Sequence, residues 1–166
     1  SADPEQGGVL RDLIHEIDYA GWLFGWPSAL QAKLRNLGRL GIHAEEVAEL
    51  SWETAVGCVL SMTLDYLTRP PRRRMSACGE RGTLDWDGIT GAVTLAGAGA
   101  PIVTQRSSQS RNEMFFAQTN AFLNADGSAC DPRLATGEDG VKALAVCDAA
   151  RRASEGGRGE EPVVDS

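Results

Sequence analysis

The residues best suited to chemistry lie close together near the N-terminus. Asp12 and His15 are three positions apart in a stretch of helical periodicity, and Glu16 and Tyr19 extend the same side. Residues three, four and seven positions apart share a helix face. An imidazole beside a carboxylate can take up and release a proton near neutral pH. The spacing therefore indicates a proton shuttle of His15 and Asp12, and the structural alternative is a pair that only braces a sheet.

A second group of candidate residues is basic. Arginines at positions 69, 72, 73 and 74 form the one basic cluster of the sequence. Guanidinium groups pair with both oxygens of a carboxylate or with a phosphate, so Arg72 and Arg73 are predicted to bind an anionic group of a substrate. The alternative is a solvated strand end whose charges offset nearby acidic residues.

Metal chemistry is not indicated by the sequence. The cysteines at positions 58, 78, 130 and 147 are far apart without a C-x-x-C motif, and His15 and His43 are the only histidines. Zinc sites need clustered ligands, so we expect no metal site. Cys58 and Cys147 stand in apolar runs, where a reduced cysteine behaves as a small hydrophobic residue.

Length and charge restrict the class of protein. The 166 residues suffice for one domain rather than two. A net charge of −7 argues against nucleic acid and against an anionic membrane surface, because phosphate groups attract basic surfaces. The sequence has no apolar run near the roughly 18 residues of a membrane span, and its first residues are unlike a signal peptide. We therefore expect a cytoplasmic protein.

The elements that must position these residues follow from hydrophobic periodicity. Apolar residues at helical spacing predict one helix over 9–24, ended by Gly25-Trp26-Pro27. Alternation with a period of two predicts strands over about 48–53, 56–66, 74–78, 83–87, 92–96 and 102–105. Helical spacing returns over about 112–123 and 137–153, the second helix with inward-facing Val141, Leu144, Ala145 and Cys147.

Consecutive strands flanked by helices predict the fold class. We expect an α+β fold, with an open, mostly antiparallel β-sheet and helices packed on one face. The domain is predicted to cover residues 9–157, between a flexible segment 1–8 and a tail 158–166. The other sheet face would carry Val59, Ser61 and Thr63, whose size lets a second sheet approach, so we expect a homodimer through it.

Four motifs follow one another in a distinctive order. They are Gly7-Gly8 with Asp12, His15, Asp18 and Trp22-Leu23-Phe24-Gly25; Asp65-Tyr66-Leu67 with Arg69-Pro70-Pro71-Arg72-Arg73 and the segment 79–87; Asn112-Glu113-Met114-Phe115-Phe116; and Asp139-Gly140 with Ala149-Ala150, Ser154 and Gly157-Arg158. This series resembles the C-terminal domain of the Gfo/Idh/MocA oxidoreductase family over nearly the whole chain.

The resemblance implies an NAD- or NADP-dependent enzyme that oxidises a sugar or sugar derivative. His15 would be the base or part of its proton relay, Asp12 would hold substrate hydroxyls or orient the imidazole, and Tyr19 would bind substrate. The family usually has three residues between this Asp and His, whereas only Leu13 and Ile14 stand between them here. One missing helical residue rotates a side chain by about 100°, which makes His15 the stronger candidate.

The dinucleotide-binding half of the family is not found in this sequence. Gly97-Ala98-Gly99-Ala100-Pro101 lacks the third glycine of G-x-G-x-x-G, and Lys33 and Lys142 stand in no Glu-Lys-Pro motif. We expect a fragment that binds no NAD or NADP alone, with a sugar substrate and its own N-terminal Rossmann domain as partners. Two other classes stay open, a non-catalytic dimerisation or binding module and a small isomerase or dehydratase with an Asp–His pair.

Overall fold

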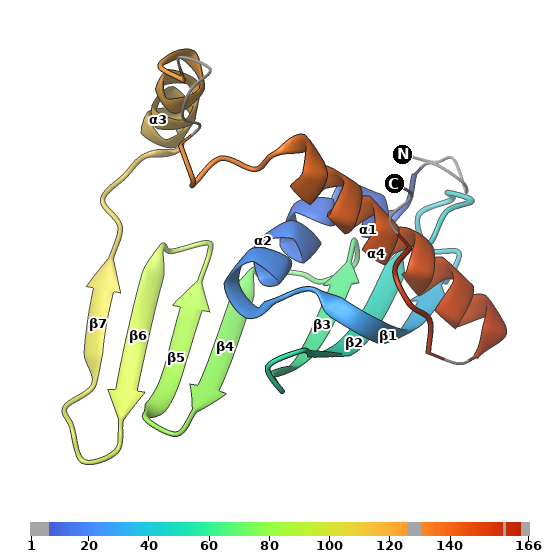
Figure 1. The fold of residues 1–166 in the computed structure, drawn as a ribbon, viewed down its shortest axis with the longest axis horizontal. Coiled ribbons are helices and arrows are strands. Elements are labelled where there is room, and N and C mark those ends of the chain that lie inside the picture. Colours follow the sequence, from blue (N-terminus) through green and yellow to red (C-terminus); the bar gives the residue numbers. More distant parts are fainter. Residues whose placement is uncertain (1–6, 126–130, 158, 164–166) are drawn as a thin grey trace. The chain divides into compact units, whose positions relative to one another are not determined.

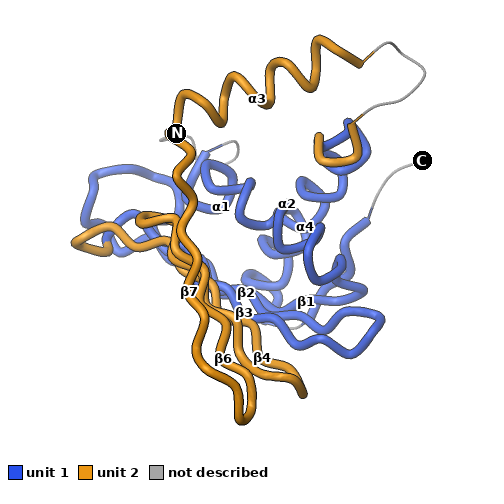
Figure 2. Tube along the Cα trace, turned by 90° about the vertical axis from the view of Figure 1, so that its left-hand side faces the viewer, with its two compact units in different colours: residues 1–67, 135–166 blue, residues 68–134 orange. Residues whose placement is uncertain are grey.

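The protein divides into two compact units. The computed structural model describes residues 7–125, 131–157 and 159–163. Residues 1–67 and 135–166 form the first unit and residues 68–134 form the second (Figure 2). The catalytic candidates Asp12 and His15 belong to the first unit, and the predicted anion-binding Arg72 and Arg73 belong to the second.

The first unit is a three-stranded antiparallel sheet with helices on one face (Figure 1). The strands pair in the order β1-β2-β3. Two short helices precede the strands in the sequence, and a long helix follows the second unit. The elements are α1 (Val9–Asp12), α2 (Ile14–Phe24), β1 (Pro27–Arg35), β2 (Val47–Thr54), β3 (Val59–Asp65) and α4 (Gly137–Gly156).

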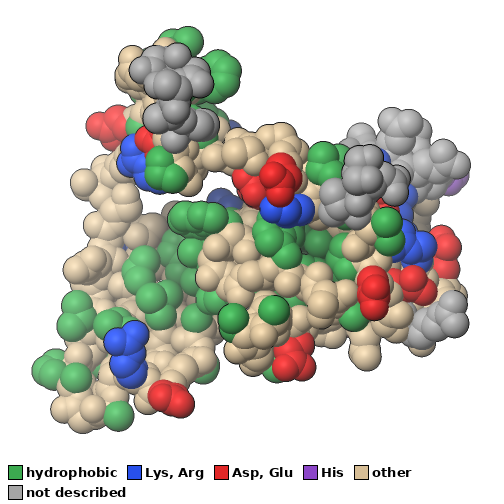
Figure 3. Space-filling view, viewed as in Figure 1, with side chains coloured by type: hydrophobic (Ala, Val, Ile, Leu, Met, Phe, Trp, Pro, Cys, Tyr) green, Lys and Arg blue, Asp and Glu red, His purple; other side chains and the backbone are tan. Residues whose placement is uncertain are grey.

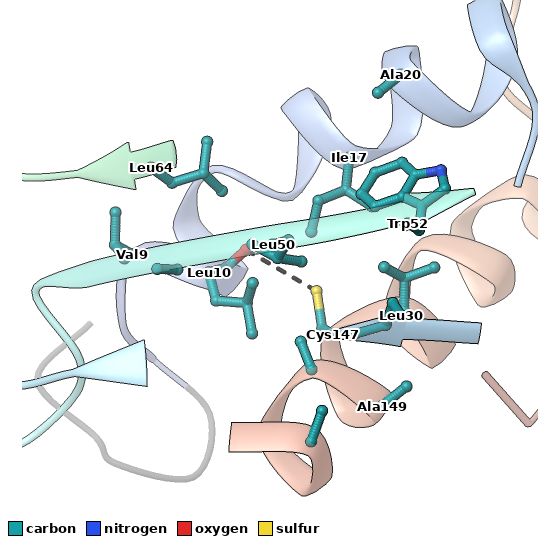
Figure 4. Close-up of a cluster of buried hydrophobic side chains, with 14 residues drawn as sticks. Val9, Leu10, Ile17, Ala20, Leu30, Leu50, Trp52, Leu64, Cys147 and Ala149 are labelled. Carbon is teal, nitrogen blue, oxygen red and sulfur yellow. Dashed lines mark hydrogen bonds between the residues drawn. The ribbon is translucent and has the colours of Figure 1, made fainter. Parts of the chain in front are cut away.

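The core of the first unit lies between these helices and the sheet (Figure 4). Leu50, Trp52 and Leu64 are buried because alternate residues of a strand point to the same face. Most buried residues of α4 are small, which lets the helix lie close to the sheet: Ala143, Ala145, Val146, Cys147, Ala149, Ala150 and Ala153. Through these residues, α4 packs against α1, α2 and β1.

The second unit holds a four-stranded antiparallel sheet in the order β4-β5-β6-β7, together with a helix. Its elements are β4 (Arg74–Gly79), β5 (Gly82–Asp87), β6 (Ala92–Gly97), β7 (Val103–Arg106) and α3 (Arg111–Leu123). Residues opposite one another in an antiparallel pair share a face. The register therefore gives one mostly apolar face, which carries Gln105 together with Met75, Ala77, Leu84, Trp86, Val93, Leu95 and Val103.

Helix α3 begins with a capping box. The Glu113 amide donates to the Ser110 hydroxyl, and the Ser110 amide donates to the Glu113 carboxylate. None of its residues is buried, so Phe116, Phe122 and Leu123 are exposed although their spacing is helical.

The predicted α+β class with antiparallel sheets is confirmed, with the strands divided between two sheets. The hairpin β4–β5, the strands β6 and β7, and helices α3 and α4 lie within a few residues of their predicted ranges. No helix among the described residues is long and apolar enough to cross a membrane.

Several local predictions were wrong. The helix predicted over 9–24 is interrupted at Leu13, whose φ of −104° and ψ of 25° lie outside the helical region. The strand predicted over 56–66 begins only at Val59, because Gly57 turns the chain with a φ of 79° and Thr54 Oγ1 accepts the Cys58 amide. Strand β1 was not predicted, although Leu30 and the residues after it alternate in polarity.

The inward face predicted for the last helix is partly wrong as well. Ala145 and Cys147 are buried, whereas Val141 is 45% and Leu144 42% exposed. Of the predicted terminal segments, residues 1–6, 158 and 164–166 lie outside the described residues. Glu160 in the predicted tail exchanges two backbone hydrogen bonds with Leu30 of β1, at 2.8 and 2.9 Å.

Candidate functional site

The start of α1 is held by Glu45, which lies just before β2. The Val9 amide donates to the Glu45 backbone oxygen at 3.0 Å, and the Leu10 amide lies 3.3 Å from its carboxylate. Such amides at a helix start have no partner within the helix, and Glu45 satisfies one through its backbone oxygen and the other through its carboxylate. Gly8 has a φ of 89°, and a Cβ there would lie 2.2 Å from Glu45 Oε1. This close approach explains the glycine before the helix.

The neighbouring Glu46 fixes the loop between β1 and β2. Its side chain is fully buried, and its carboxylate accepts the amides of Leu37, Arg39 and Leu40 at 2.9, 2.8 and 2.6 Å. Its backbone oxygen accepts the amide of Tyr66 at 3.1 Å. Glu46 thus ties the end of β3 to this loop.

Asp12 and Tyr66 form the contact between α1 and the end of β3. Asp12, the last residue of α1, is exposed, and its Oδ2 accepts a hydrogen bond from the Tyr66 hydroxyl. The Tyr66 ring packs against the core. Burial, the hydrogen bond to Asp12 and the charges of Asp12 and Glu45 raise the pKa of Tyr66 well above its ordinary value. The phenol therefore stays a donor at neutral pH.

His15 lies in the first turn of α2, next to the carboxylate of Glu16. Its Nε2 lies 3.2 Å from Glu16 Oε1, with the His15 side chain 55% exposed and the Glu16 side chain 12% exposed. His15 is thus accessible to a ligand, and the partly buried Glu16 carboxylate lies beside its imidazole.

The break at Leu13 changes how Asp12 and His15 relate to each other. Asp12 ends one helical segment and His15 is the second residue of the next. The rotation of a side chain expected for a continuous helix therefore does not apply to this pair. Both side chains are exposed on the first unit. Glu16, which the sequence placed on the same side, lies beside His15, whereas the contact of Tyr66 with Asp12 was not predicted.

The other predicted substrate-binding residues are placed differently. Tyr19 lies one turn after His15 on α2 and is partly buried. Arg72 and Arg73 are exposed in the second unit, just before β4. The Arg73 guanidinium lies 5.1 Å from the centre of the Trp86 ring, which is a cation–π distance. The arginine cluster is therefore partly engaged with its own sheet.

The glycine-rich segment 97–101 lacks the local geometry of a dinucleotide-binding turn. The glycine-rich segment 97–101 joins β6 to β7. A pyrophosphate binds where a glycine turn opens a helix, and this turn opens a strand. Within the same described ranges, no three His, Cys, Asp or Glu residues are grouped so that they could hold a metal ion.

The thiols differ in accessibility. Cys147 is completely buried, and burial raises the pKa of its thiol to about 12. Its Sγ lies 3.9 Å from the Leu10 backbone oxygen (Figure 4). Cys78 is exposed and Cys58 is half-buried in the turn before β3, whereas Cys130 lies outside the described residues.

The sequence is similar to a described protein family. The sequence matches the family described as "Oxidoreductase family, C-terminal alpha/beta domain" over residues 2–163. No match was found among curated proteins.

Solved structures share the fold. Levoglucosan dehydrogenase in complex with NADH and L-sorbose has a TM-score of 0.84 at 16% identity, covering 96% of this chain and 51% of that one. Aldose-aldose oxidoreductase from Caulobacter crescentus complexed with glycerol has a TM-score of 0.78 at 24% identity, covering 93% and 48%. The WlbA dehydrogenase from Bordetella pertussis, in complex with NADH and UDP-GlcNAcA, has a TM-score of 0.69 at 23% identity, covering 96% and 46%. The chain spans about half the length of these structures.

Proposed function

The chain is a member of the Gfo/Idh/MocA oxidoreductase family and matches the C-terminal α/β domain of that family. On this premise we propose that it is the substrate-side domain of an NAD- or NADP-dependent enzyme that oxidises a sugar or sugar derivative. The observation that carries the proposal is the accessible pair Asp12 and His15, each held by its own partner, Tyr66 and Glu16. The ligands of the solved structures, which include L-sorbose and UDP-GlcNAcA, support a carbohydrate substrate.

In the proposed reaction, His15 takes the proton of the substrate hydroxyl that becomes a carbonyl, and NAD or NADP, when bound, would accept the hydride from the same carbon. Glu16, 3.2 Å away, stabilises the charge that His15 then carries. Asp12 accepts hydrogen bonds from substrate hydroxyls, and Tyr66 holds its carboxylate. Because the glycine-rich segment 97–101 fits no dinucleotide, we place NAD or NADP in an N-terminal Rossmann domain outside these residues.

The test of this function uses the full-length protein that contains this chain. NAD or NADP is offered with a panel of neutral aldoses, polyols and nucleotide sugars, and the reduced cofactor is followed by its absorbance. We expect at least one carbohydrate to support cofactor reduction. Failure of the whole panel with both cofactors would contradict the proposal and favour a binding module or an isomerase.

We also propose that the protein forms a homodimer through a sheet face. The face that the sequence indicated, with Val59 and Thr63, also carries Lys33, Glu49 and Glu53, as the register of β1, β2 and β3 shows. Charged side chains are depleted at the core of interfaces. The apolar face of the second unit's sheet is better suited to a second copy.

The exposure of this apolar face supports its use as an interface. On this face, Leu95 of the inner strand β6 is 51% exposed, and Val103 of the edge strand β7 is 52% exposed. Figure 3 shows hydrophobic side chains spread over the strands of this sheet on the viewed side. Two sheets that stack face to face approach to about 10 Å, and a stable interface buries at least about 1,000 Å².

A further inference from the structure

Tyr66, which follows the end of β3, places its hydroxyl group against Asp12 and is itself held firmly. The backbone amide of Tyr66 donates to the Glu46 oxygen at 3.1 Å. The carboxylate of Glu46 is in turn buried and saturated by three backbone amides of the preceding loop. With its ring packed on the core, Tyr66 is fixed at both its backbone and its side chain.

Asp12 by contrast lies at a point where the helix gives it little support. It ends α1, a helix of four residues, and the next residue, Leu13, leaves the helical conformation. An exposed aspartate at such a position can adopt several rotamers. The hydroxyl of Tyr66 selects among them because it hydrogen-bonds to Oδ2.

We propose that Tyr66 is a positioning residue, which orients the Asp12 carboxylate toward substrate hydroxyls beside His15. This inference rests on the proposed function. Tyr66 acts through Asp12 and transfers no proton itself. The raised pKa of Tyr66 agrees with this role, because the phenol keeps the proton that it donates to Asp12 over the physiological range.

The position of Tyr66 also bears on the shortened spacing between Asp12 and His15. With two residues between them, the pair cannot rely on the regular geometry of one helix, and the structure breaks at Leu13. The direction of Asp12 is then set from β3, whereas His15 is held from within α2 by Glu16. The two groups therefore have separate supports, and each can be altered alone.

The experiment compares Tyr66→Phe, Asp12→Asn and the double variant in the full-length protein, with the best carbohydrate of the panel as substrate. Phenylalanine keeps the ring in the core and removes only the hydroxyl. We expect KM to rise about tenfold in Tyr66→Phe, the usual effect of a lost hydrogen bond to a charged group, with kcat within about twofold of wild type. The double variant should match Asp12→Asn, because Tyr66 acts only through Asp12.

The outcomes separate this inference from the proposed function. Two results would overturn the positioning role: a wild-type KM in Tyr66→Phe, or effects of the two single variants that simply add in the double variant. In either case, measurable activity of the wild-type protein still upholds the proposed function. Thermal unfolding of each variant shows that the fold is retained. A full-length protein inactive on every carbohydrate would overturn the proposed function, and the positioning role with it.

Discussion

Tyr66 connects the chemistry of the site to the stability of the first unit. Its pKa is raised by burial and by the hydrogen bond and charge of Asp12. A group whose pKa is higher in the folded than in the unfolded state stabilises the fold fully below its unfolded pKa. That contribution is lost as the pH rises above this value, about 10 for tyrosine.

We therefore expect wild-type protein to lose stability as the pH rises above about 10, and Tyr66→Phe to lose less over the same range. Urea unfolding of both proteins across this range measures the difference. An equal loss in the free energy of unfolding of both proteins at alkaline pH would contradict the burial and the Asp12 hydrogen bond of the Tyr66 side chain.

Single residues also show the limit of what the sequence reveals. Asp12 and His15 could be recognised because their types and spacing carry chemistry by themselves. Tyr66 could not, because it follows an alternating apolar strand and lies 54 positions from Asp12 in the sequence. Glu45 and Glu46 were hidden in the same way, since a carboxylate that caps amides has no periodic pattern.

At the scale of elements, the break between α1 and α2 is a tertiary effect. Leu10, Ile14 and Ile17 keep a helical spacing across it, so periodicity alone predicts one helix. The break arises where α1 is held by Glu45 and Tyr66 from the side of the sheet. The hairpin β4–β5 was predictable for the opposite reason, because its pairing is local.

Because Gly8 lies against the Glu45 carboxylate, we expect a methyl group added at Gly8 to destabilise the protein. Gly8→Ala places a Cβ against the Glu45 carboxylate at a positive φ, and we expect a loss of about 1–3 kcal/mol in the free energy of unfolding. Gly140→Ala in α4 is the matched control, since no atom lies within 4 Å of its Cβ. It should raise stability by about 0.5–1 kcal/mol. Equal urea midpoints for the two variants would refute the role given to Gly8.

At the scale of the molecule, the division into two sheets was not predictable. Strands adjacent in the sequence, β3 and β4, belong to different sheets, and period-two alternation does not say which strands pair. The amphipathic second sheet nonetheless follows from the alternation within each strand. Its apolar face leads to the prediction for assembly.

Leu95→Arg should separate the proposed homodimer, because it places a charge on the apolar face of β6. Thr94→Arg is the matched control, since the adjacent residue points to the opposite face. Sedimentation equilibrium at micromolar concentration should give twice the monomer mass for wild type and Thr94→Arg, and the monomer mass for Leu95→Arg. A monomeric wild type, or a dimer that persists in Leu95→Arg, would refute this interface.

In the proposed function, His15 takes the proton from the substrate. The most direct test of this step is the kcat of His15→Gln in the full-length protein, against His43→Gln, which changes the exposed histidine of the loop before β2. Loss of a general base lowers kcat by about 100-fold or more, and we expect this for His15→Gln with a wild-type kcat for His43→Gln. A wild-type kcat in His15→Gln would contradict the account.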